Sequence, residues 1–325
     1  MDRLCKIKTI GVLTSGGDSP GMNAAVYAVT QAALGRGMRV MGIRRGYAGL
    51  IGGDIFELDS LAVSGIIHKG GTFLNTARCP EFKSEDGIRR AVEVCRQFGI
   101  DGVVVVGGDG SLRGAADLSA RGVPCVGLPG TIDNDIAASD YSIGYDTALN
   151  TVMRMVDKLR DTSMSHDRCS VVEVMGRKTG WLTLEAGFAV GATYIILPEF
   201  EYDFEDLVAR MNKFLEEGKK HFIVMVAEGV GGVVELAQRI EARTGVESRA
   251  TILGHVQRGG SPCARDRVAA SRLGYHAVSL LSRGVGDRVV VLQKDEVRDY
   301  DIREALGMTK KMDRFMYDMA SVLSC

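Results

Sequence analysis

Three short segments combine glycine with acidic or hydroxyl side chains, and each one directly follows an apolar run of residues. They are Thr14–Asp18, Gly107–Ser111 and Pro129–Asp135. In a parallel α/β sheet such loops leave the same edge, which is the edge where ligands bind. Glycine amides can surround a polyphosphate, whereas the carboxylates of Asp109, Asp133 and Asp135 need a cation or a proton to share that space. This combination suits phosphoryl transfer.

The acids of the third segment alternate along the chain. In an extended segment, Thr131, Asp133 and Asp135 would project to the same side, so that one carboxylate could accept a proton while the other supports a metal. The alternative is a polar turn, in which Asp133 and Asn134 bond their own backbone. We favour the functional interpretation because a bare turn does not require the preceding Pro129-Gly130-Thr131.

Two well-known phosphate-binding patterns, G-x-x-x-x-G-K-[ST] and an intact G-x-G-x-x-G, do not occur in the sequence. Gly108-Asp109-Gly110 comes nearest to the second, but Arg113 stands where the third glycine belongs. A dinucleotide-dependent oxidoreductase would need that glycine, which argues against this class. Any one glycine turn can be purely structural, because glycine adopts positive φ without strain. Three such loops at one edge indicate a function.

Arginine lies beside glycine in two further loops, Met175-Gly176-Arg177 and Gln257-Arg258-Gly259-Gly260, with Arg249 and His255 nearby. Guanidinium groups bind phosphate through two parallel hydrogen bonds, so these loops are candidate anion sites. For each single arginine, the alternative is a solvated or salt-bridged side chain. For His255, the alternative is a buried ring that is hydrogen-bonded within the protein.

Short apolar runs rich in β-branched residues predict strands, and longer stretches with helical spacing separate them. Strands are expected at 10–13, 40–43, 102–106, 123–128, 170–174, 194–197, 222–226, 250–253 and 288–292. Helices are expected at 22–35, 85–98, 111–120, 146–159, 204–217, 233–243 and 265–281, with Ser111 as the N-cap of the third. This alternation predicts parallel sheets that helices cover on both faces.

The composition is that of a globular protein large enough for two domains, with 325 residues of which 46% are hydrophobic and 25% charged. The formal net charge of -1 gives no overall positive field, so neither nucleic acid nor a membrane is an expected partner. No signal-peptide pattern or membrane-spanning apolar run is evident. The 7 cysteines lack metal-binding spacing, and reduced thiols in a cytoplasmic protein account for them.

Six segments, in order along almost the whole chain, resemble the bacterial ATP-dependent 6-phosphofructokinase family. They are T-S-G-G-D-S-P-G-M-N-A from Thr14, G-G-T-F-L from Gly70, V-G-G-D-G-S from Val106, P-G-T-I-D-N-D from Pro129, V-E-V-M-G-R from Val172 and L-G-H-V-Q-R-G-G-S-P from Leu253. The resemblance implies a cytoplasmic, Mg2+-dependent kinase of glycolysis. Such an enzyme phosphorylates the 1-hydroxyl of fructose 6-phosphate with ATP, giving fructose 1,6-bisphosphate and ADP.

The resemblance also implies an α/β fold with two doubly wound three-layer α/β/α domains, mostly parallel sheets and an active site in the cleft between the domains. The ATP-binding domain would comprise residues 1–143 and 257–305. The fructose 6-phosphate-binding domain would comprise residues 144–256 and 306–325.

Catalytic roles follow from the resemblance at matching positions. Asp133 would be the general base, with Thr131 close to the sugar, and Asp109 and Asp135 would hold the metal. Arg78 and Arg177 would neutralise the charge of the transferred phosphoryl group. The ATP site would be lined by Gly17, Tyr47, Arg78, Cys79, Gly108, Asp109, Gly110 and Ser111.

Binding of the sugar phosphate is likewise implied by the resemblance. The residues concerned are Thr131, Asp133, Arg168, Met175, Gly176, Arg177, Glu228, Arg249, His255 and Arg258. In the family, Arg168 and Arg249 reach the site from a neighbouring subunit, so a homotetramer with shared active sites is expected.

Two glycines bear on the phosphoryl donor. Pyrophosphate-dependent members of the family carry an acid at the position of Gly110 and a lysine at the position of Gly130. A carboxylate at the first position would repel the α-phosphate of ATP, so glycine there predicts that ATP is the donor.

The effector site of the family departs from its usual pattern in this chain. Arg160, Lys219 and His221 remain, whereas Tyr27, Gln31, Ser60 and Glu217 replace cations and Thr193 replaces an acid. Because fewer cations weaken a phosphate pocket, we expect weak, absent or altered control by nucleoside diphosphate or phosphoenolpyruvate.

Two alternative functions stay open. The first is a pyrophosphate-dependent or other sugar-phosphate kinase of the same superfamily. The second is a non-catalytic paralogue that senses nucleotide and sugar phosphate, although a protein that only binds has no need of a base beside the phosphate.

Overall fold

The computed structural model describes residues 7–323 of the chain, which divides into two units. Among the described residues, unit 1 contains 7–147 and Arg258–Lys310, and unit 2 contains Ala148–Gln257 and 311–323. Each unit has its own sheet and its own apolar core. No helix among residues 7–323 combines the length and the apolar character needed to cross a bilayer.

The sheet of unit 1 has the strand order β11-β10-β5-β4-β1-β2-β3. Its strands are β1 (Thr9–Ser15), β2 (Arg39–Ile43), β3 (Ile55–Leu58), β4 (Gly102–Gly107), β5 (Cys125–Pro129), β10 (Arg288–Gln293) and β11 (Glu296–Asp301). The inner strands pair in parallel, and β3 and β11 close the two edges with antiparallel pairing. Strands β1 and β4 are buried along their whole length, which explains why their sequences are almost continuously apolar.

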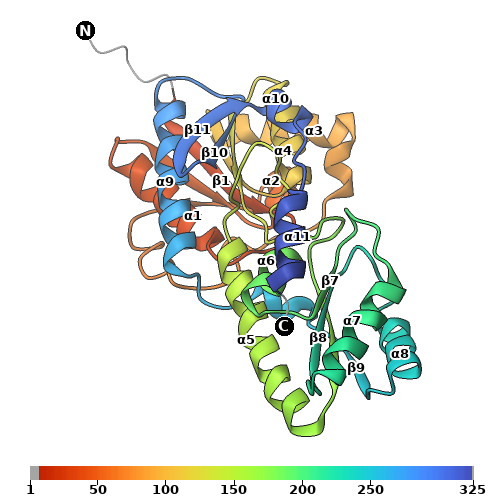
Figure 1. Ribbon diagram of the computed structural model, residues 1–325. Helices are drawn as coiled ribbons and strands as arrows, with labels where there is room; N and C mark the ends of the chain where they lie inside the picture. The colour runs from red at the N-terminus through yellow and green to blue at the C-terminus, as the bar shows by residue number, and fades with distance from the viewer. Residues whose placement is uncertain (1–6, 324–325) are drawn as a thin grey trace. The chain divides into compact units, whose positions relative to one another are not determined.

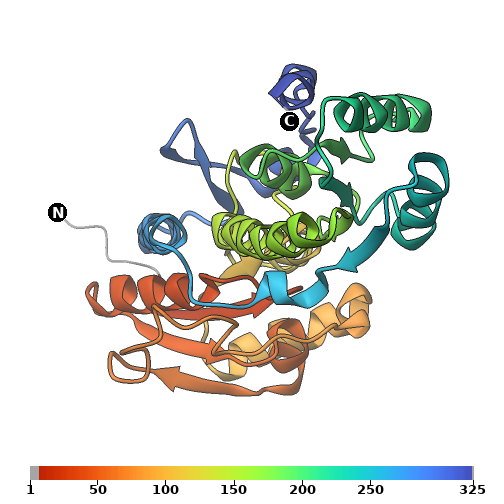
Figure 2. The same cartoon turned by 60° about the horizontal axis from the view of Figure 1, so that its bottom comes forward.

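Helices cover both faces of this sheet (Figures 1 and 2). On one face, α1 (Met22–Leu34) packs against α9 (Ala264–Ser282). On the other lie α2 (Gly46–Gly52), the short 3-10 helix η1 (Pro80–Lys83), α3 (Glu85–Gln97), α4 (Asp109–Ser119) and α10 (Ile302–Gly307). Alternation along β4 explains the two faces, since Val103 and Val105 belong to the core under α3 and α4 whereas Val104 points the other way.

Unit 2 is built on a parallel sheet with the order β7-β8-β6-β9. Its strands are β6 (Cys169–Val174), β7 (Tyr194–Ile196), β8 (Phe222–Ala227) and β9 (Ser248–Ile252). One face is covered by α7 (Phe204–Glu216) and α8 (Val233–Thr244), and the other by α6 (Trp181–Ala189) and α11 (Arg314–Leu323) (Figure 1). The long α5 (Tyr145–His166) leads from unit 1 into unit 2, and the 3-10 helix η2 (Gly254–Arg258) leads back.

The α/β class with mostly parallel sheets is confirmed, and every strand and helix expected from the sequence is present, although α5 continues to His166, well beyond its expected end at 159. The N-cap assignment of Ser111 is wrong. Helix α4 begins at Asp109, and its N-cap is Gly108, which has an extended backbone and no capping side chain. The N-cap is thus the residue that directly follows β4, and the helix starts three residues earlier than it would with Ser111 as its N-cap.

The buried carboxylate of Asp266, near the start of α9, holds the beginning of α5. It accepts hydrogen bonds from the amide nitrogen of Gly144 at 2.6 Å and from that of Thr147 at 2.9 Å. The hydroxyls of Tyr141 and Thr147 also donate to it. Because the first amides of a helix have no partner within the helix, this carboxylate acts as an N-cap supplied from a distant part of the chain.

We predict that Asp266→Ala lowers the free energy of unfolding by at least about 2 kcal/mol, because several buried donors lose their acceptor together. Asp318→Ala is the control, since the Asp318 carboxylate is 56% exposed on a regular helix and pairs with the exposed Arg314 at 2.9 Å. Urea unfolding followed by circular dichroism measures both variants. Equal losses in the two variants would contradict the capping role.

Candidate functional site

The three glycine loops lie side by side at the carboxyl edge of the unit 1 sheet. Ser15 of β1 is paired with Gly107 of β4, and Gly107 is paired with Pro129 of β5, so the three strands end level with one another. The amide of Gly130 donates to the carbonyl of Gly107 at 3.0 Å, which ties the second and third loops together. The prediction that the loops share one edge is therefore confirmed.

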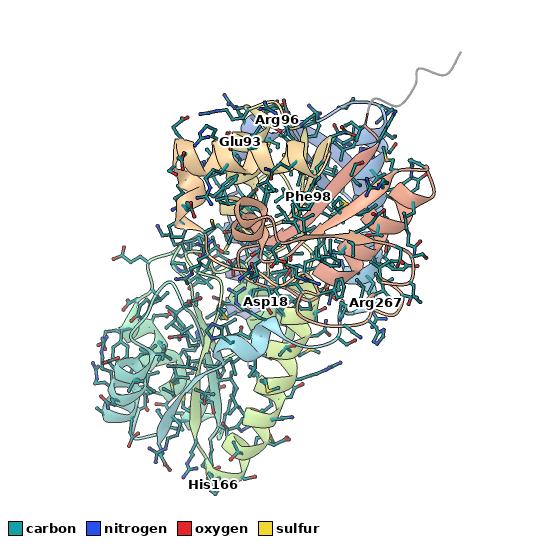
Figure 3. The ribbon with its side chains drawn as sticks, turned by 180° about the vertical axis from the view of Figure 1, so that it is seen from behind. Asp18, Glu93, Arg96, Phe98, His166 and Arg267 are labelled. Carbon is teal, nitrogen blue, oxygen red and sulfur yellow. The ribbon has the colours of Figure 1, made fainter. Side chains whose placement is uncertain are left out.

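The first loop passes close to the second and to Arg258. Asp18 marks its position in Figure 3, where Arg96 and Phe98 at the end of α3 lie toward the other edge of the sheet. A side chain at Gly17 would meet the Arg258 guanidinium, whose Nη1 lies 2.5 Å from the place of a Cβ. The same guanidinium donates to the carbonyl of Asp18 at 3.2 Å. Two residues predicted for different ligands, Gly17 and Arg258, are thus in direct contact.

The second loop turns directly into α4. A Cβ at Gly107 would lie 2.4 Å from the carbonyl oxygen of Ser15, so this position accepts no side chain. Beyond it, the amino end of α4 presents Asp109, Gly110 and Ser111 at the sheet edge. The first amides of a helix carry partial positive charge and suit an anion such as a phosphate.

Tyr47 lies beneath this helix. Its ring is 5% exposed and stacks on Phe82 with the ring centroids 4.0 Å apart. Its hydroxyl donates to the carbonyl of Ser111 at 2.7 Å, and burial raises the Tyr47 pKa well above its usual value. Tyr47 therefore supports the start of α4 with a neutral phenol.

The third loop differs from the extended segment that the sequence analysis assumed. Asn134 has a φ of 50°, in the left-handed region, and the Thr131 hydroxyl accepts a hydrogen bond from the Asp133 amide at 3.2 Å. The expectation of an extended backbone is therefore wrong, because local side-chain bonding shapes a turn. Thr131 and Asp133 are buried, and Asp133 is only 3% exposed.

Two of the predicted site acids line one cavity of about 140 Å³, within unit 1. The lining residues are Asp109, Leu112, Arg113, Asp135, Ile136, Ala137, Ala305, Leu306 and Met308. Arg113 pairs with both carboxylate oxygens of Asp109, at 2.8 and 3.1 Å. Among residues 7–323 no group of three or more histidine, cysteine, aspartate or glutamate side chains could hold a metal. Mg2+ commonly needs only one or two carboxylates when phosphate oxygens and waters complete its shell, so this pair suits that ion.

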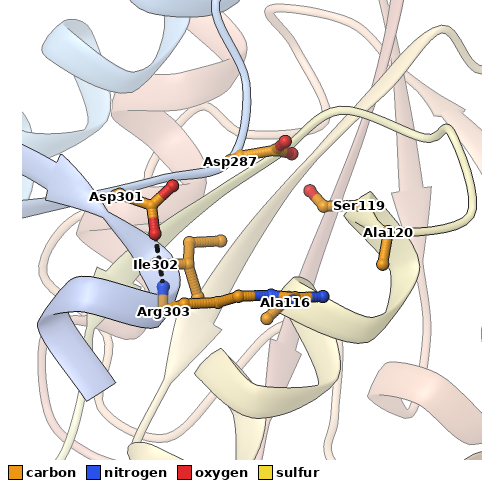
Figure 4. Close-up of a pocket in the computed structure, with 7 residues that line it drawn as sticks. All are labelled: Ala116, Ser119, Ala120, Asp287, Asp301, Ile302 and Arg303. Atoms are coloured by element: carbon orange, nitrogen blue, oxygen red, sulfur yellow. Dashed lines mark hydrogen bonds between the residues drawn. The ribbon is translucent and has the colours of Figure 1, made fainter. Parts of the chain in front are cut away.

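A second cavity of about 120 Å³ lies elsewhere in unit 1 (Figure 4). Ala116, Ser119 and Ala120 of α4 line it together with Asp287 and the Asp301–Arg303 segment. Asp287 precedes β10, which places this cavity at the amino edge of the sheet, away from the glycine loops. In the close-up the Asp301 carboxylate caps α10 through the Arg303 amide, at 2.8 Å.

Arg78 and Cys79 lie at the end of a long loop that polar side chains hold in place. The hydroxyl of Thr76 donates to the carbonyl of Gly16 at 2.7 Å. Asn23 of α1, buried at 2% exposure, donates to the carbonyls of Lys69 and Gly70 and accepts from the amide of Phe73. Its motif was recognised in the sequence, but no role was assigned to it, because it contacts backbone groups that only the fold brings near.

Arg78 itself is exposed and, within the part of the chain that the structure describes, makes no hydrogen bond or ion pair. An arginine of this kind keeps all its donors for a ligand. Cys79 is half-buried at the N-cap of η1.

In unit 2, the carboxylate of Glu228 holds the turn that follows β6. It accepts from the amide of Gly176 at 3.2 Å and from that of Arg177 at 3.1 Å. This arrangement fixes the backbone of Met175, Gly176 and Arg177, three residues predicted to bind the sugar. Burial and then the nearby negative charge of Glu228 raise the pKa of Glu173 on β6.

The remaining predicted phosphate ligands of unit 2 lie near β9. Arg168 donates to Glu247 at 2.7 Å, and Arg249 donates to the other oxygen of the same carboxylate. Glu247 therefore orders both guanidinium groups, each of which retains further donors. His255 is exposed on η2.

Arg160, Lys219 and His221, which the sequence analysis gave as the remnant of a possible effector site, are close to one another in unit 2. Burial, followed by the charges of Lys219 and Arg160, lowers the pKa of His221. Lys219 also lies 3.4 Å from the hydroxyl of Thr193, and Arg160 donates to the carbonyl of Val190. Two of the replaced positions in unit 1, Gln31 and Ser60, hydrogen-bond to each other at 2.9 Å.

Comparison with known proteins matches residues 9–281 to the model of one family, described as Phosphofructokinase. The chain is 55% identical over 318 residues to an ATP-dependent 6-phosphofructokinase of Clostridium botulinum, covering 98% of this chain and 100% of that protein. A protein of the same name from Clostridium novyi is 54% identical over 98% of this chain and all of its own length.

Solved structures of phosphofructokinases also resemble this chain. A phosphofructokinase from Saccharomyces cerevisiae superposes with a TM-score of 0.87 and 33% identity over 97% of this chain, which spans only 46% of the yeast chain. A pyrophosphate-dependent phosphofructokinase from Marinobacter aquaeolei superposes with a TM-score of 0.86. At 21% identity, over 98% of this chain and 92% of the other, the second likeness concerns the fold alone.

We predict that Asn23→Ala loosens the loop 69–76, because three backbone groups lose one buried partner. Amide hydrogen exchange of this loop should become about tenfold faster, which corresponds to roughly 1.4 kcal/mol of lost local stability. Gln31→Ala is the matched control, since Gln31 lies on the same helix and bonds only to exposed Ser60. Unchanged exchange in Asn23→Ala would contradict the anchoring role.

Proposed function

The chain belongs to the phosphofructokinase family, and we propose that it transfers the γ-phosphoryl group of ATP to the 1-hydroxyl of fructose 6-phosphate. The products are fructose 1,6-bisphosphate and ADP. The observation that carries this proposal is the level ending of β1, β4 and β5, which gathers two glycine loops and an acid loop at one edge. Glycolysis in the cytoplasm is the proposed setting.

Asp133 is the proposed general base. Its carboxylate takes the proton of the sugar hydroxyl while that oxygen forms a bond to the γ-phosphorus and the bond from the γ-phosphorus to the β-phosphate oxygen breaks. Burial to 3% exposure and the short turn with Thr131 support this role, because a base must be held in one orientation.

Charge neutralisation is assigned to the metal and to arginines. Asp109 and Asp135 would hold Mg2+, and the cavity that they share supports this assignment. When bound, this ion neutralises part of the negative charge on the terminal phosphates. Arg78 and Arg177 supply further positive charge from the protein, which matters because the transition state spreads charge over the equatorial oxygens.

The two substrates are assigned to binding residues in the two units. Gly17, the start of α4 and the Arg78–Cys79 segment bind ATP in unit 1, and Met175–Arg177 with Glu228 bind the sugar in unit 2. The domain ranges inferred from the resemblance, with boundaries at 143/144, 256/257 and 305/306, stay a prediction.

His255 and Arg258 bind the 6-phosphate together with Arg168 and Arg249 from a neighbouring subunit of a homotetramer. The order that Glu247 imposes on these last two arginines supports a prepared anion site. Weak or altered effector control remains part of the proposal.

We predict that Asp133→Asn lowers kcat about a thousandfold and leaves the affinity for both substrates within a few-fold, because only proton transfer is lost. Asp161→Asn, on the exposed side of α5, is the control and should retain full activity. A coupled assay with titrated fructose 6-phosphate and ATP measures both variants. Activity that survives the change at Asp133 would show that another group is the base.

The same assay separates the alternative functions. Rapid turnover with pyrophosphate and none with ATP would favour the pyrophosphate-dependent alternative. Binding of both substrates without turnover would favour the non-catalytic one.

We predict that Gly110→Asp raises the KM for ATP more than tenfold, because a carboxylate would repel the α-phosphate. Gly110 is exposed and a Cβ there meets nothing within 4 Å, so the change should not disturb folding. Gly110→Asn, similar in size and neutral, is the control and should have a smaller effect. Equal KM values in the two variants would argue against a phosphate beside this position.

A further inference from the structure

We propose that Lys310 is a positioning residue for phosphoryl transfer, and that its ammonium group holds in shape the loop that carries Asp133 and Asp135. The inference rests on the proposed function of that loop. Lys310 follows α10 and is separated by more than 170 residues from the loop it contacts, so no local motif identifies it.

The ammonium group of Lys310 bridges two backbone carbonyls. It donates to the oxygen of Asn134 at 3.0 Å and to the oxygen of Ser139 at 3.0 Å. These carbonyls belong to the first and last residues of the segment 134–139. One half-buried cation therefore links the two ends of this segment. Hydrogen bonds from a charged donor are stronger than those between neutral groups.

The two ends of that segment differ in how they are fixed. The Ser139 hydroxyl accepts from the amide of Leu292 at 3.1 Å, and Asp140 accepts from the amide of Lys294 at 2.8 Å, which anchors the far end to β10. The near end is the left-handed Asn134, between the two acids. Asn134 reaches the fixed end through its own side-chain amide, at 3.2 Å from the Asp140 carbonyl, and through Lys310.

The chain around Lys310 also forms part of the acid-lined cavity. Ala305, Leu306 and Met308 line it together with Asp109 and Asp135. Lys310 follows Met308 by two residues and donates to the carbonyl of the peptide that joins Asn134 to Asp135. A positive charge at this place both orients the peptide and offsets the negative charge of the neighbouring acids.

Substitutions of Lys310 can separate the effect of its hydrogen bonds from the effect of its charge. Lys310→Met removes the hydrogen bonds and the charge, Lys310→Gln removes the charge while keeping a donor, and Lys310→Arg keeps both. Lys311→Met is the matched control, because Lys311 is the next residue and is exposed.

For Lys310→Met we expect kcat to fall between tenfold and a hundredfold, because a displaced base no longer meets the hydroxyl. The KM values should change less than about threefold. Lys310→Arg should restore most of the activity. In Lys310→Gln, which keeps a donor without the charge, kcat should lie between the values of Lys310→Met and Lys310→Arg. Lys311→Met should behave as the unchanged protein.

Hydrogen exchange of residues 133–140 tests the proposal without reference to activity. Faster exchange in Lys310→Met than in Lys311→Met is expected, and equal exchange together with equal kcat would overturn the proposal. If Lys310→Met does not fold, the same comparison is made with Lys310→Gln, and exchange and kcat equal to those of Lys311→Met overturn the proposal. An unchanged chain that fails to phosphorylate fructose 6-phosphate would refute the proposed function instead, while the exchange result still decides whether Lys310 holds the loop.

Discussion

The alignment of β1, β4 and β5 is the constraint on which the candidate site depends. Ser15, Gly107 and Pro129 occupy one row across the sheet, so the chain leaves all three strands at the same level. A slip of one residue in either pairing would move every side chain of the strand to the opposite face of the sheet, where it would meet a different layer of helices. The close packing of the fully buried β1 and β4 opposes such a slip. The chemistry of the loops is therefore fixed by the packing of apolar residues below them.

The loops keep their shape through polar side chains that belong to other elements. Asn23 of α1 holds the segment before Arg78, and the Tyr47 hydroxyl supports the start of α4. In unit 2 the same arrangement recurs, with Glu228 holding the backbone of the turn at Gly176. Loops without regular structure leave backbone amides and carbonyls unpaired, and polar side chains from other elements satisfy these groups while fixing one conformation.

Much of the fold could be predicted because its signals are local. The runs of valine and isoleucine in β4 and β8 identify strands, and the order of the glycine loops identifies the functional edge. Other elements were not predicted, and their sequences explain why. The edge strand β11 reads Glu-Val-Arg-Asp-Tyr-Asp, which is polar because it has one neighbour, and its turn places Lys294 and Asp295 at positive φ without a glycine.

Helix α6 escaped prediction because its apolar residues surround it and give no amphipathic period. At the site, the types of the acids were visible in the sequence, but the left-handed backbone of Asn134 was not. Other contacts join distant residues. Asp266 accepts from Gly144 across 122 positions, and Glu247 accepts from Arg168 across 79, so no local pattern reveals them.

The split of unit 1 along the sequence has a consequence for biosynthesis. The sheet acquires β10 and β11, and α1 acquires its partner α9, only after residues 258–310 have been made. Until then, on the ribosome, the apolar face of α1 has no cover and α5 lacks its distant carboxylate cap. The intervening segment 148–257 contains every strand of the second sheet. The order of synthesis therefore allows the sheet of unit 2 to form while the larger sheet of unit 1 is still incomplete.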